Sequence, residues 1–345
     1  MPQPLGKKII DWFLAEKRKL PWREDPTPYR VWISEVMLQQ TRASVVVDYF
    51  RRWMKKFPTI EALAMAKAED VMKAWEGLGY YNRARNLHLA AKVFHHQYGG
   101  QIPDSYEKLL QVKGFGPYTA AAVMSFAFHQ KAAAVDANVA RVVSRFFLVE
   151  EDIGKPAVQK KLRELTERLL PDEDPWIVME ALIELGATLC GKTAQCTRCP
   201  LQDGCQAFQN EKVDQIPFKK KKKQTQYIFQ HVVILIANEY VLVEQMEEGK
   251  VLGGLFQFPS FDGQLEQEEY IKNHFAADAL WHKDLSKVHC SYTYFQVELQ
   301  PSIWLLDYPI EITGYHWKKR AALEELPFSS GHKRILGLLN KEILT

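Results

Sequence analysis

The sequence lacks any hydrophobic stretch that approaches the ~18 uninterrupted apolar residues of a membrane span. Its first residues, MPQPLGKKIIDWF, are charged early and lack the apolar core of an export signal, so we expect a cytoplasmic, nucleoid-associated protein. It also lacks an excess of one charge, because 45 Lys and Arg face 42 Asp and Glu, a net charge of +3. This balance permits nucleic-acid binding without establishing it.

Cysteine is scarce, yet four of the five cysteines lie in one polar stretch: Cys190, Cys196, Cys199 and Cys205. Thiolates select zinc or iron-sulfur clusters. Zinc sites with four cysteines usually contain two CxxC pairs set well apart, whereas here one CxxC lies between two single cysteines and Pro200 follows it. We therefore expect an iron-sulfur cluster, with zinc as the alternative. Disulfides are disfavoured in a chain without a secretory signal.

The 345 residues are enough for two or three domains. Apolar residues recur at helical spacing from residue 7 to about 208, which predicts an all-α first half. The six most periodic segments are 9–14, 31–38, 71–78, 87–94, 118–128 and 176–189.

A lysine run at 219–223 interrupts this pattern as a solvated linker would. After it, β-branched and aromatic residues alternate over 227–244 with a turn at Asn238, and 288–299 and 303–306 also favour strands. We expect a mostly α domain at 1–217, a basic linker at 218–226 and an α+β domain at 227–345.

The segment 110–122 joins two helical patterns through Gly114 and Gly116, which is a helix-hairpin-helix signature. Such glycines let backbone N–H groups approach a phosphate where the next helix begins. A plain helix C-cap followed by a new helix would explain the same pattern.

Asp136 stands at the start of the helix that follows the hairpin. Taken alone, it is a fair N-cap. However, the order of a glycine-rich hairpin, an aspartate and a cysteine cluster resembles the endonuclease III superfamily of DNA glycosylases, which flip a base from the duplex and cut its glycosidic bond. Members that also nick the strand carry a lysine nucleophile where this chain has Tyr118, so the resemblance implies a monofunctional enzyme.

Three segments of the first half, LPWR (20–23), WISEVMLQQT (32–41) and GLGYY (77–81), closely resemble motifs of the adenine DNA glycosylase (MutY) family. The resemblance implies removal of adenine mispaired with 8-oxoguanine or guanine in duplex DNA. It also implies a 4Fe-4S cofactor held by the four clustered cysteines, although the family usually has six residues between the first two cysteines and here there are five.

Glu35 is the expected general acid. On a helix it shares a face with Val31 and Leu38, so its carboxyl should be partly sheltered and its pKa raised. Adenine leaves readily only when a ring nitrogen is protonated. The sugar then develops oxocarbenium charge, and Asp136 supplies a carboxylate to stabilise or trap it.

The other site residues are implied by the resemblance alone. Tyr118 and Asn138 align with supporting catalytic residues; the adenine pocket aligns with Trp22, Arg23, Leu38 and Glu180; and the residues that wedge the duplex and contact the lesion base align with Gln40, Thr41 and Tyr80. For the pocket and wedge residues, core packing is the alternative role.

The C-terminal half resembles the family's lesion-recognition domain, which is similar to the Nudix fold. The stretch 251–259 matches a family segment, but the ordered glutamates of a working Nudix hydrolase are missing, so we expect a binding module. The family's Phe-Ser-His loop aligns with 290–292, where only Ser291 is kept.

We therefore predict a monomeric, monofunctional adenine DNA glycosylase that acts on double-stranded DNA. The alternatives are an endonuclease III-type glycosylase for another base or mismatch, and a non-catalytic iron-sulfur protein that binds damaged DNA.

Overall fold

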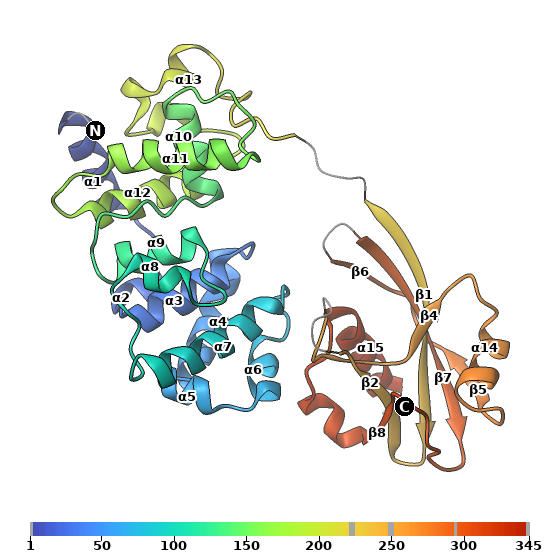
Figure 1. Ribbon diagram of the computed structural model, residues 1–345. Helices are drawn as coiled ribbons and strands as arrows, with labels where there is room; N and C mark the ends of the chain where they lie inside the picture. Colours follow the sequence, from blue (N-terminus) through green and yellow to red (C-terminus); the bar gives the residue numbers. More distant parts are fainter. Residues whose placement is uncertain (1–2, 221–224, 248–251, 293–294, 343–345) are drawn as a thin grey trace. The chain divides into compact units, whose positions relative to one another are not determined.

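The structure is a computed structural model that describes residues 3–220, 225–247, 252–292 and 295–342 (Figure 1). Residues 221–224 of the expected linker and Val251 of the expected 251–259 stretch lie outside the described residues. The chain forms two compact units, Met1–Met65 with Asn86–Lys221, and Ala66–Arg85 with Lys222–Thr345. The segment Ala66–Arg85 thus groups with the second unit, although the first unit surrounds it in the sequence. None of the described helices has both the length and the apolar character that a bilayer crossing needs.

The first unit is helical, as predicted. Its helices are α1 (Gln3–Glu16), α2 (Pro21–Glu24), α3 (Pro28–Leu38), α4 (Ala43–Lys56), α5 (Ile60–Met65), most of α7 (Asn82–Gln97), α8 (Tyr106–Leu110), α9 (Pro117–Phe126), α10 (Ala137–Phe146), α11 (Pro156–Leu169), α12 (Pro175–Thr188) and α13 (Gln206–Gln209), with 3₁₀ turns η1 (Cys196–Arg198) and η2 (Gln202–Gly204). Helix α12 packs against α1, α9 and α10, and α3 packs against α4 and α9.

Proline and capping residues mark where these helices begin. Pro28, Pro117, Pro156 and Pro175 each open a helix, where the missing N–H costs nothing.

The sequence prediction at 71–78 extended too far, because α6 (Ala68–Trp75) ends before Gly77 and Gly79. Both glycines have positive φ, +95° and +71°, which an α-helix does not accept.

The second unit contains an eight-stranded mixed sheet with the order β3-β2-β1-β7-β5, in which β4 pairs with β1, β6 with β7 and β8 with β2. The strands are β1 (Gln226–Ala237), β2 (Tyr240–Gln245), β3 (Phe256–Gln257), β4 (Ser260–Asp262), β5 (Leu280–Asp284), β6 (Val288–Tyr292), β7 (Phe295–Leu306) and β8 (His316–Lys319). Strands β1 and β7 are parallel from Gln226 opposite Phe295 to Ala237 opposite Leu306. The turn expected at Asn238 is confirmed between β1 and β2, with φ of +54°.

The prediction of one strand over 288–299 was wrong. The chain reverses between β6 and β7, which form an antiparallel pair from Val288 opposite Leu299 to Tyr292 opposite Phe295. Strand β7 then continues through Pro301 to Leu306. Both arms of this hairpin are rich in β-branched and aromatic residues, and no Gly or Pro marks the turn, so the pattern read as continuous.

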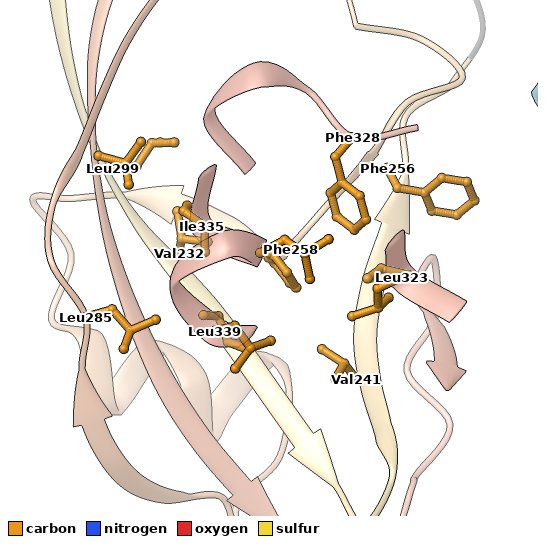
Figure 2. Packing of buried hydrophobic residues seen from close by; sticks show 14 of the residues in the cluster. Val232, Val241, Phe256, Phe258, Leu285, Leu299, Leu323, Phe328, Ile335 and Leu339 are labelled. Carbon is orange, nitrogen blue, oxygen red and sulfur yellow. The ribbon is translucent and has the colours of Figure 1, made fainter. Parts of the chain in front are cut away.

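Alternate residues of β1 serve the two faces of the sheet. Val232 and Ile234 belong to a core shared with α15 (Ser330–Glu342) and the 3₁₀ turn η3 (Arg320–Glu325). Val233 and Leu235 belong to a second core on the opposite face, shared with α14 (Gln267–His274). Figure 2 shows the first core, in which Phe258 and Phe328 lie among aliphatic side chains from the sheet and from α15.

Candidate active site

A cavity of about 990 Å³ opens in the helical unit among α2, α3, α9, α10 and α12. It brings together ten of the residues singled out in the sequence, although they are spread over more than half of the unit. These residues are Trp22, Arg23, Glu35, Leu38, Gln40, Thr41, Tyr118, Asp136, Asn138 and Glu180. Tyr80, Gly114, Gly116 and Ser291 do not line it.

Glu35 is almost completely buried in α3, with 6% of its surface exposed. Burial raises its pKa from 4.5 to about 7, and the negative charges of Asp136 and Glu180 act in the same direction. The hydroxyl of Tyr118 donates a hydrogen bond to Glu35 Oε2 at 2.5 Å, which opposes this rise. The carboxyl can therefore carry a proton at neutral pH, as the sequence predicted.

Asp136 is the N-cap of α10 and also lines the cavity. Its two oxygens accept separate hydrogen bonds, one from the backbone N–H of Val139 and one from the side-chain amide of Asn138, both at 2.8 Å. Burial raises the pKa of Asp136, whereas these two hydrogen bonds favour the ionised form. Because the N-cap geometry uses only one oxygen, the capping and catalytic interpretations of Asp136 are compatible.

Trp22 and Arg23 support one wall of the cavity. Trp22 is buried and packs edge-to-face on Phe50, with 5.6 Å between ring centroids, so it contributes both to the core and to the cavity lining. Arg23 lies 3.3 Å from Glu180 and 3.0 Å from Glu184.

The sequence reasoning missed Glu184 and Arg18. Glu184 is fully buried and accepts a hydrogen bond from Arg18 Nε at 2.6 Å, so two arginines hold one carboxylate. These ion pairs favour its ionised form, and its pKa is lowered although burial raises it. The spacing offered a signal, since Glu184 follows Glu180 by one helical turn and shares its face.

Gly186 allows α12 to approach the start of α10. A Cβ at this position would lie 2.6 to 2.8 Å from the Cβ, carbonyl oxygen and carbonyl carbon of Asn138, so any side chain would push the two helices apart. Arg141 then joins the same two helices: its Nη2 donates to Asn138 Oδ1 at 2.9 Å and to Gly186 O at 2.7 Å. The position of Asn138, and through it of Asp136, therefore depends on the contact between α10 and α12.

The predicted hairpin lies between α8 and α9. Gly114 has φ of +100°, and a Cβ there would meet the Cβ of Asn86 at 2.8 Å, so glycine is required. Gly116 is the N-cap of α9 and has a φ of −97° that any residue can adopt. The first N–H groups of α9 point out of the helix start, as in anion-binding helix termini.

The four clustered cysteines line one small cavity of about 30 Å³ after α12. Among the described residues, no three His, Cys, Asp or Glu side chains are close enough to hold a single metal ion. A tetrahedral zinc ion needs all four sulfurs within about 2.3 Å of one point. In a cluster each thiolate binds a different iron, so the four sulfurs need not converge on one point.

Two arginines of α10 bind the loop that carries the first cysteine. Arg145 is buried and its Nη1 lies 3.3 Å from Cys190 Sγ and 2.8 Å from Gly191 O. Arg141 Nε donates to Cys190 O at 2.7 Å. The helix that begins at Asp136 is thereby tied to the cysteine loop.

In the second unit, Ser291 and Tyr80 line one cavity of about 390 Å³. Its walls contain several neutral hydroxyl and amide groups, from Gln230, Gln257, Ser260, Ser329 and Ser330. Tyr80 is about half exposed and has φ of +50°. Tyr80 and Ser291 thus line the same cavity although they are more than 200 positions apart. The family resemblance linked both of them to the lesion base.

Comparisons with known proteins find relatives for both halves of the chain. Residues 33–168 match the model for HhH-GPD superfamily base excision DNA repair proteins, and residues 231–338 match the NUDIX domain. A solved structure of a thermostable thymine-DNA glycosylase aligns with a TM-score of 0.55 and 29% identity, over 60% of this chain and 96% of that one.

Adenine DNA glycosylases align over most of the chain. That of Buchnera aphidicola subsp. Baizongia pistaciae (strain Bp) is 34% identical over 270 residues, 76% of each protein. That of Buchnera aphidicola subsp. Acyrthosiphon pisum (strain APS) is 31% identical over 314 residues, 90% of this chain and 89% of the relative. With a helical base-excision unit, a NUDIX domain and these relatives, the chain belongs to the adenine DNA glycosylase (MutY) family.

Proposed function

We propose that this protein removes adenine paired with 8-oxoguanine or guanine from double-stranded DNA, acting as a monomer in the cytoplasm. The observation that carries this proposal is the pairing of Glu35 with Asp136 at one cavity of about 990 Å³. Burial raises the pKa of Glu35 to about 7, and both oxygens of Asp136 accept hydrogen bonds. Such a pair suits the cleavage of a glycosidic bond, which needs both an acid and an anion.

In the proposed reaction, Glu35 donates its proton to a ring nitrogen of the extruded adenine. The bond between that base and C1′ of the sugar breaks, and its electron pair leaves with the base. The carboxylate of Asp136 then faces the cationic sugar and stabilises or traps it. Water attacks C1′ and returns a proton to Glu35.

Tyr118 and Asn138 position the two carboxyl groups in this scheme. The Tyr118 hydroxyl orients Glu35, and the Asn138 amide orients Asp136. Because residue 118 is a tyrosine instead of a lysine, no amine is available there to form a Schiff base. We therefore expect base removal without strand cleavage.

Trp22, Arg23, Leu38 and Glu180 are proposed to form the adenine pocket. Trp22 and Leu38 provide apolar surface for the base, while Arg23 and Glu180 form an ion pair at the same cavity. A site that combines apolar walls with a few fixed polar groups can hold a flipped base and read its edge.

Lesion reading is proposed for Gln40, Thr41, Tyr80 and Ser291. Gln40 has φ of +58°, and Gln40 and Thr41 follow the C-cap of α3 and line the catalytic cavity. Tyr80 and Ser291 share the cavity in the second unit, whose hydroxyl and amide groups can both donate and accept hydrogen bonds.

Gly114 and Gly116 are proposed to hold the phosphate backbone.

Cys190, Cys196, Cys199 and Cys205 would hold a 4Fe-4S cluster, whose role when bound is to order the loop at 190–205. We propose the domain boundaries that the composition indicated: a catalytic domain at 1–217, a linker at 218–226 and a lesion-recognition domain at 227–345. The exposed Lys192 and Arg198 of the cysteine loop can face phosphates.

The test is a single-turnover excision assay on duplexes that carry adenine opposite 8-oxoguanine, guanine, cytosine or thymine, with thymine mismatches and thymine glycol alongside. We expect excision of adenine opposite 8-oxoguanine or guanine, and no strand break without alkali. Glu35→Gln and Asp136→Asn should each lower the rate about 10²- to 10⁴-fold while duplex binding persists. Glu61→Gln, an exposed glutamate of α5, is the matched control.

Excision of thymine or thymine glycol instead of adenine would favour the endonuclease III-type alternative. Binding without turnover would favour the non-catalytic one. Undiminished excision by Glu35→Gln would remove that residue from the mechanism. The visible absorption of the purified protein distinguishes an iron-sulfur cluster from colourless zinc.

A further inference from the structure

The loop 76–81, between α6 and α7, holds both backbone polar groups of Phe328. The N–H of Phe328 donates to Glu76 Oε1 at 2.9 Å, and its carbonyl accepts from the Tyr81 hydroxyl at 3.5 Å. The same hydroxyl accepts the N–H of Gly77 at 3.2 Å. All these residues belong to the second unit.

Two lysines reinforce this contact around Glu76, which is only 14% exposed. Lys73 Nζ donates to Glu76 Oε2 at 2.9 Å and to Leu326 O at 3.0 Å. Lys333 Nζ lies 3.8 Å from the same carboxylate oxygen. Charged hydrogen bonds in such a sheltered place are stronger than those of an exposed ion pair.

Phe328, to which the loop is bonded, has a fixed position in the core of the second unit. It is fully buried, and its ring packs on Phe258 with 5.3 Å between centroids (Figure 2). The flanking backbone is bonded to β3, where the N–H of Phe256 donates to Pro327 O at 2.8 Å. A displacement of Phe328 would therefore disturb the core shared by the sheet and α15.

The other side of the loop is fixed at Gly79. Its carbonyl accepts from Trp75 Nε1 at 3.0 Å and from Arg83 Nη2 at 3.1 Å. Arg83 also lies over the Tyr80 ring, 5.6 Å from its centroid. The residues on both sides of Tyr80 in the chain are thus held by hydrogen bonds, and Tyr80 lines the cavity that it shares with Ser291.

We propose that Glu76, together with Lys73 and Tyr81, fixes the position of Tyr80 relative to Ser291 in the cavity that these two residues share. In this way the three residues set the preference for the base opposite adenine. The inference rests on the proposed function, because it assigns lesion reading to this cavity. Glu76 is not among the residues that line the adenine cavity. Its loss should therefore weaken discrimination and leave the bond cleavage itself intact.

The experiment uses the whole 345-residue chain and four variants: Glu76→Ala, Glu76→Gln, Tyr81→Phe and, as matched control, Glu69→Ala, an exposed glutamate of α6. Two quantities are measured. One is the ratio of kcat/KM for adenine opposite 8-oxoguanine to that opposite guanine. The other is amide hydrogen exchange of the peptide that contains Phe328.

For Glu76→Ala we expect the ratio to fall about tenfold through KM, and the Phe328 amide to exchange about tenfold faster, because one charge-assisted hydrogen bond is lost. The kcat opposite guanine and the control variant should match the wild type. Glu76→Gln keeps an oxygen for the Phe328 N–H and should rescue most of the protection. Tyr81→Phe should change both quantities in the same direction, by less.

An unchanged ratio in Glu76→Ala would overturn the inference, whatever the exchange rate, and so would unchanged exchange. Should Glu76→Ala fail to fold, Glu76→Gln and Tyr81→Phe decide by the same two measurements. A wild type that does not excise adenine, or has no preference for 8-oxoguanine, would instead refute the proposed function.

Discussion

The cavity at Glu35 and Asp136 and the cavity at Tyr80 and Ser291 differ in the chemistry of their walls. The cavity of the helical unit is lined by Glu35, Asp136 and Glu180 together with Arg18 and Arg23, and burial raises the pKa of all three acids. The cavity at Tyr80 and Ser291 is lined, within the described residues, by hydroxyl, amide and apolar groups, the Cys290 thiol and the His332 imidazole, and by no carboxylate. Burial lowers the pKa of His332 to about 4, so this imidazole is neutral at pH 7. Carboxyl groups that can gain or lose a proton suit bond cleavage, whereas neutral hydrogen-bond donors and acceptors suit the recognition of a base edge.

The largest expected difference between the cavities is in their response to pH. Because the pKa of Glu35 is about 7, the single-turnover rate should fall about tenfold for each pH unit above this value, or about a hundredfold at pH 9. Affinity for 8-oxoguanine opposite an uncleavable adenine analogue should change much less over this range. A rate independent of pH up to 9 would contradict the assignment of Glu35 as the acid.

The next effect concerns stability. Glu35 has a pKa of 4.5 when exposed and about 7 when folded, so the folded state binds more protons between these values and loses stability as pH rises through them. Glu35→Gln should therefore be more stable than the wild type at pH 8, by about 3 kcal/mol as an upper bound. The difference should vanish below pH 4.5 in urea unfolding curves. A constant difference across pH would show that burial of this carboxyl has no cost.

A smaller effect is expected from the contact between α10 and α12. Gly186→Ala places a Cβ within 2.6 Å of Asn138, so we expect a loss of about 1–3 kcal/mol in the free energy of unfolding. The excision rate should fall as well, because Asn138 orients Asp136. Gly337→Ala in α15 is the matched control, since nothing lies within 4 Å of its Cβ. Equal stabilities of the two variants would contradict this view of the helix contact.

The smallest effect should come from the second cavity. Ser291→Ala removes one hydroxyl and should weaken binding to 8-oxoguanine duplexes about two- to tenfold, the value of a single neutral hydrogen bond. Excision from adenine opposite guanine should not change. The measurement is a titration of both duplexes in parallel. An equal loss on both would show that Ser291 contributes to general DNA binding instead of lesion reading.

Sequence reasoning predicted the helices, and the burial of Glu35, best where the signal was local. The apolar spacing around Glu35 predicted a sheltered carboxyl, and its burial and raised pKa confirm this. The strand break between β6 and β7 was missed, because the turn lacks Gly and Pro.

Local sequence patterns could not predict which residues contact the candidate site residues. Arg23 meets Glu184 across 161 positions, and Glu76 meets Phe328 across 252. No periodicity reports such contacts, since helical and strand patterns extend over only a few residues.

The sequence by itself determined which chemical groups are available and in what order: an acid within an apolar helix face, an aspartate at a helix start, four clustered thiols and a separate β-rich half. Only the tertiary structure decided which of them meet. The pKa of Glu35, the ion pairs of Glu184 and the attachment of the Tyr80 loop to Phe328 all depend on burial and on contacts between distant segments. Desolvation and hydrogen bonding act through space, so they arise only when the chain is folded.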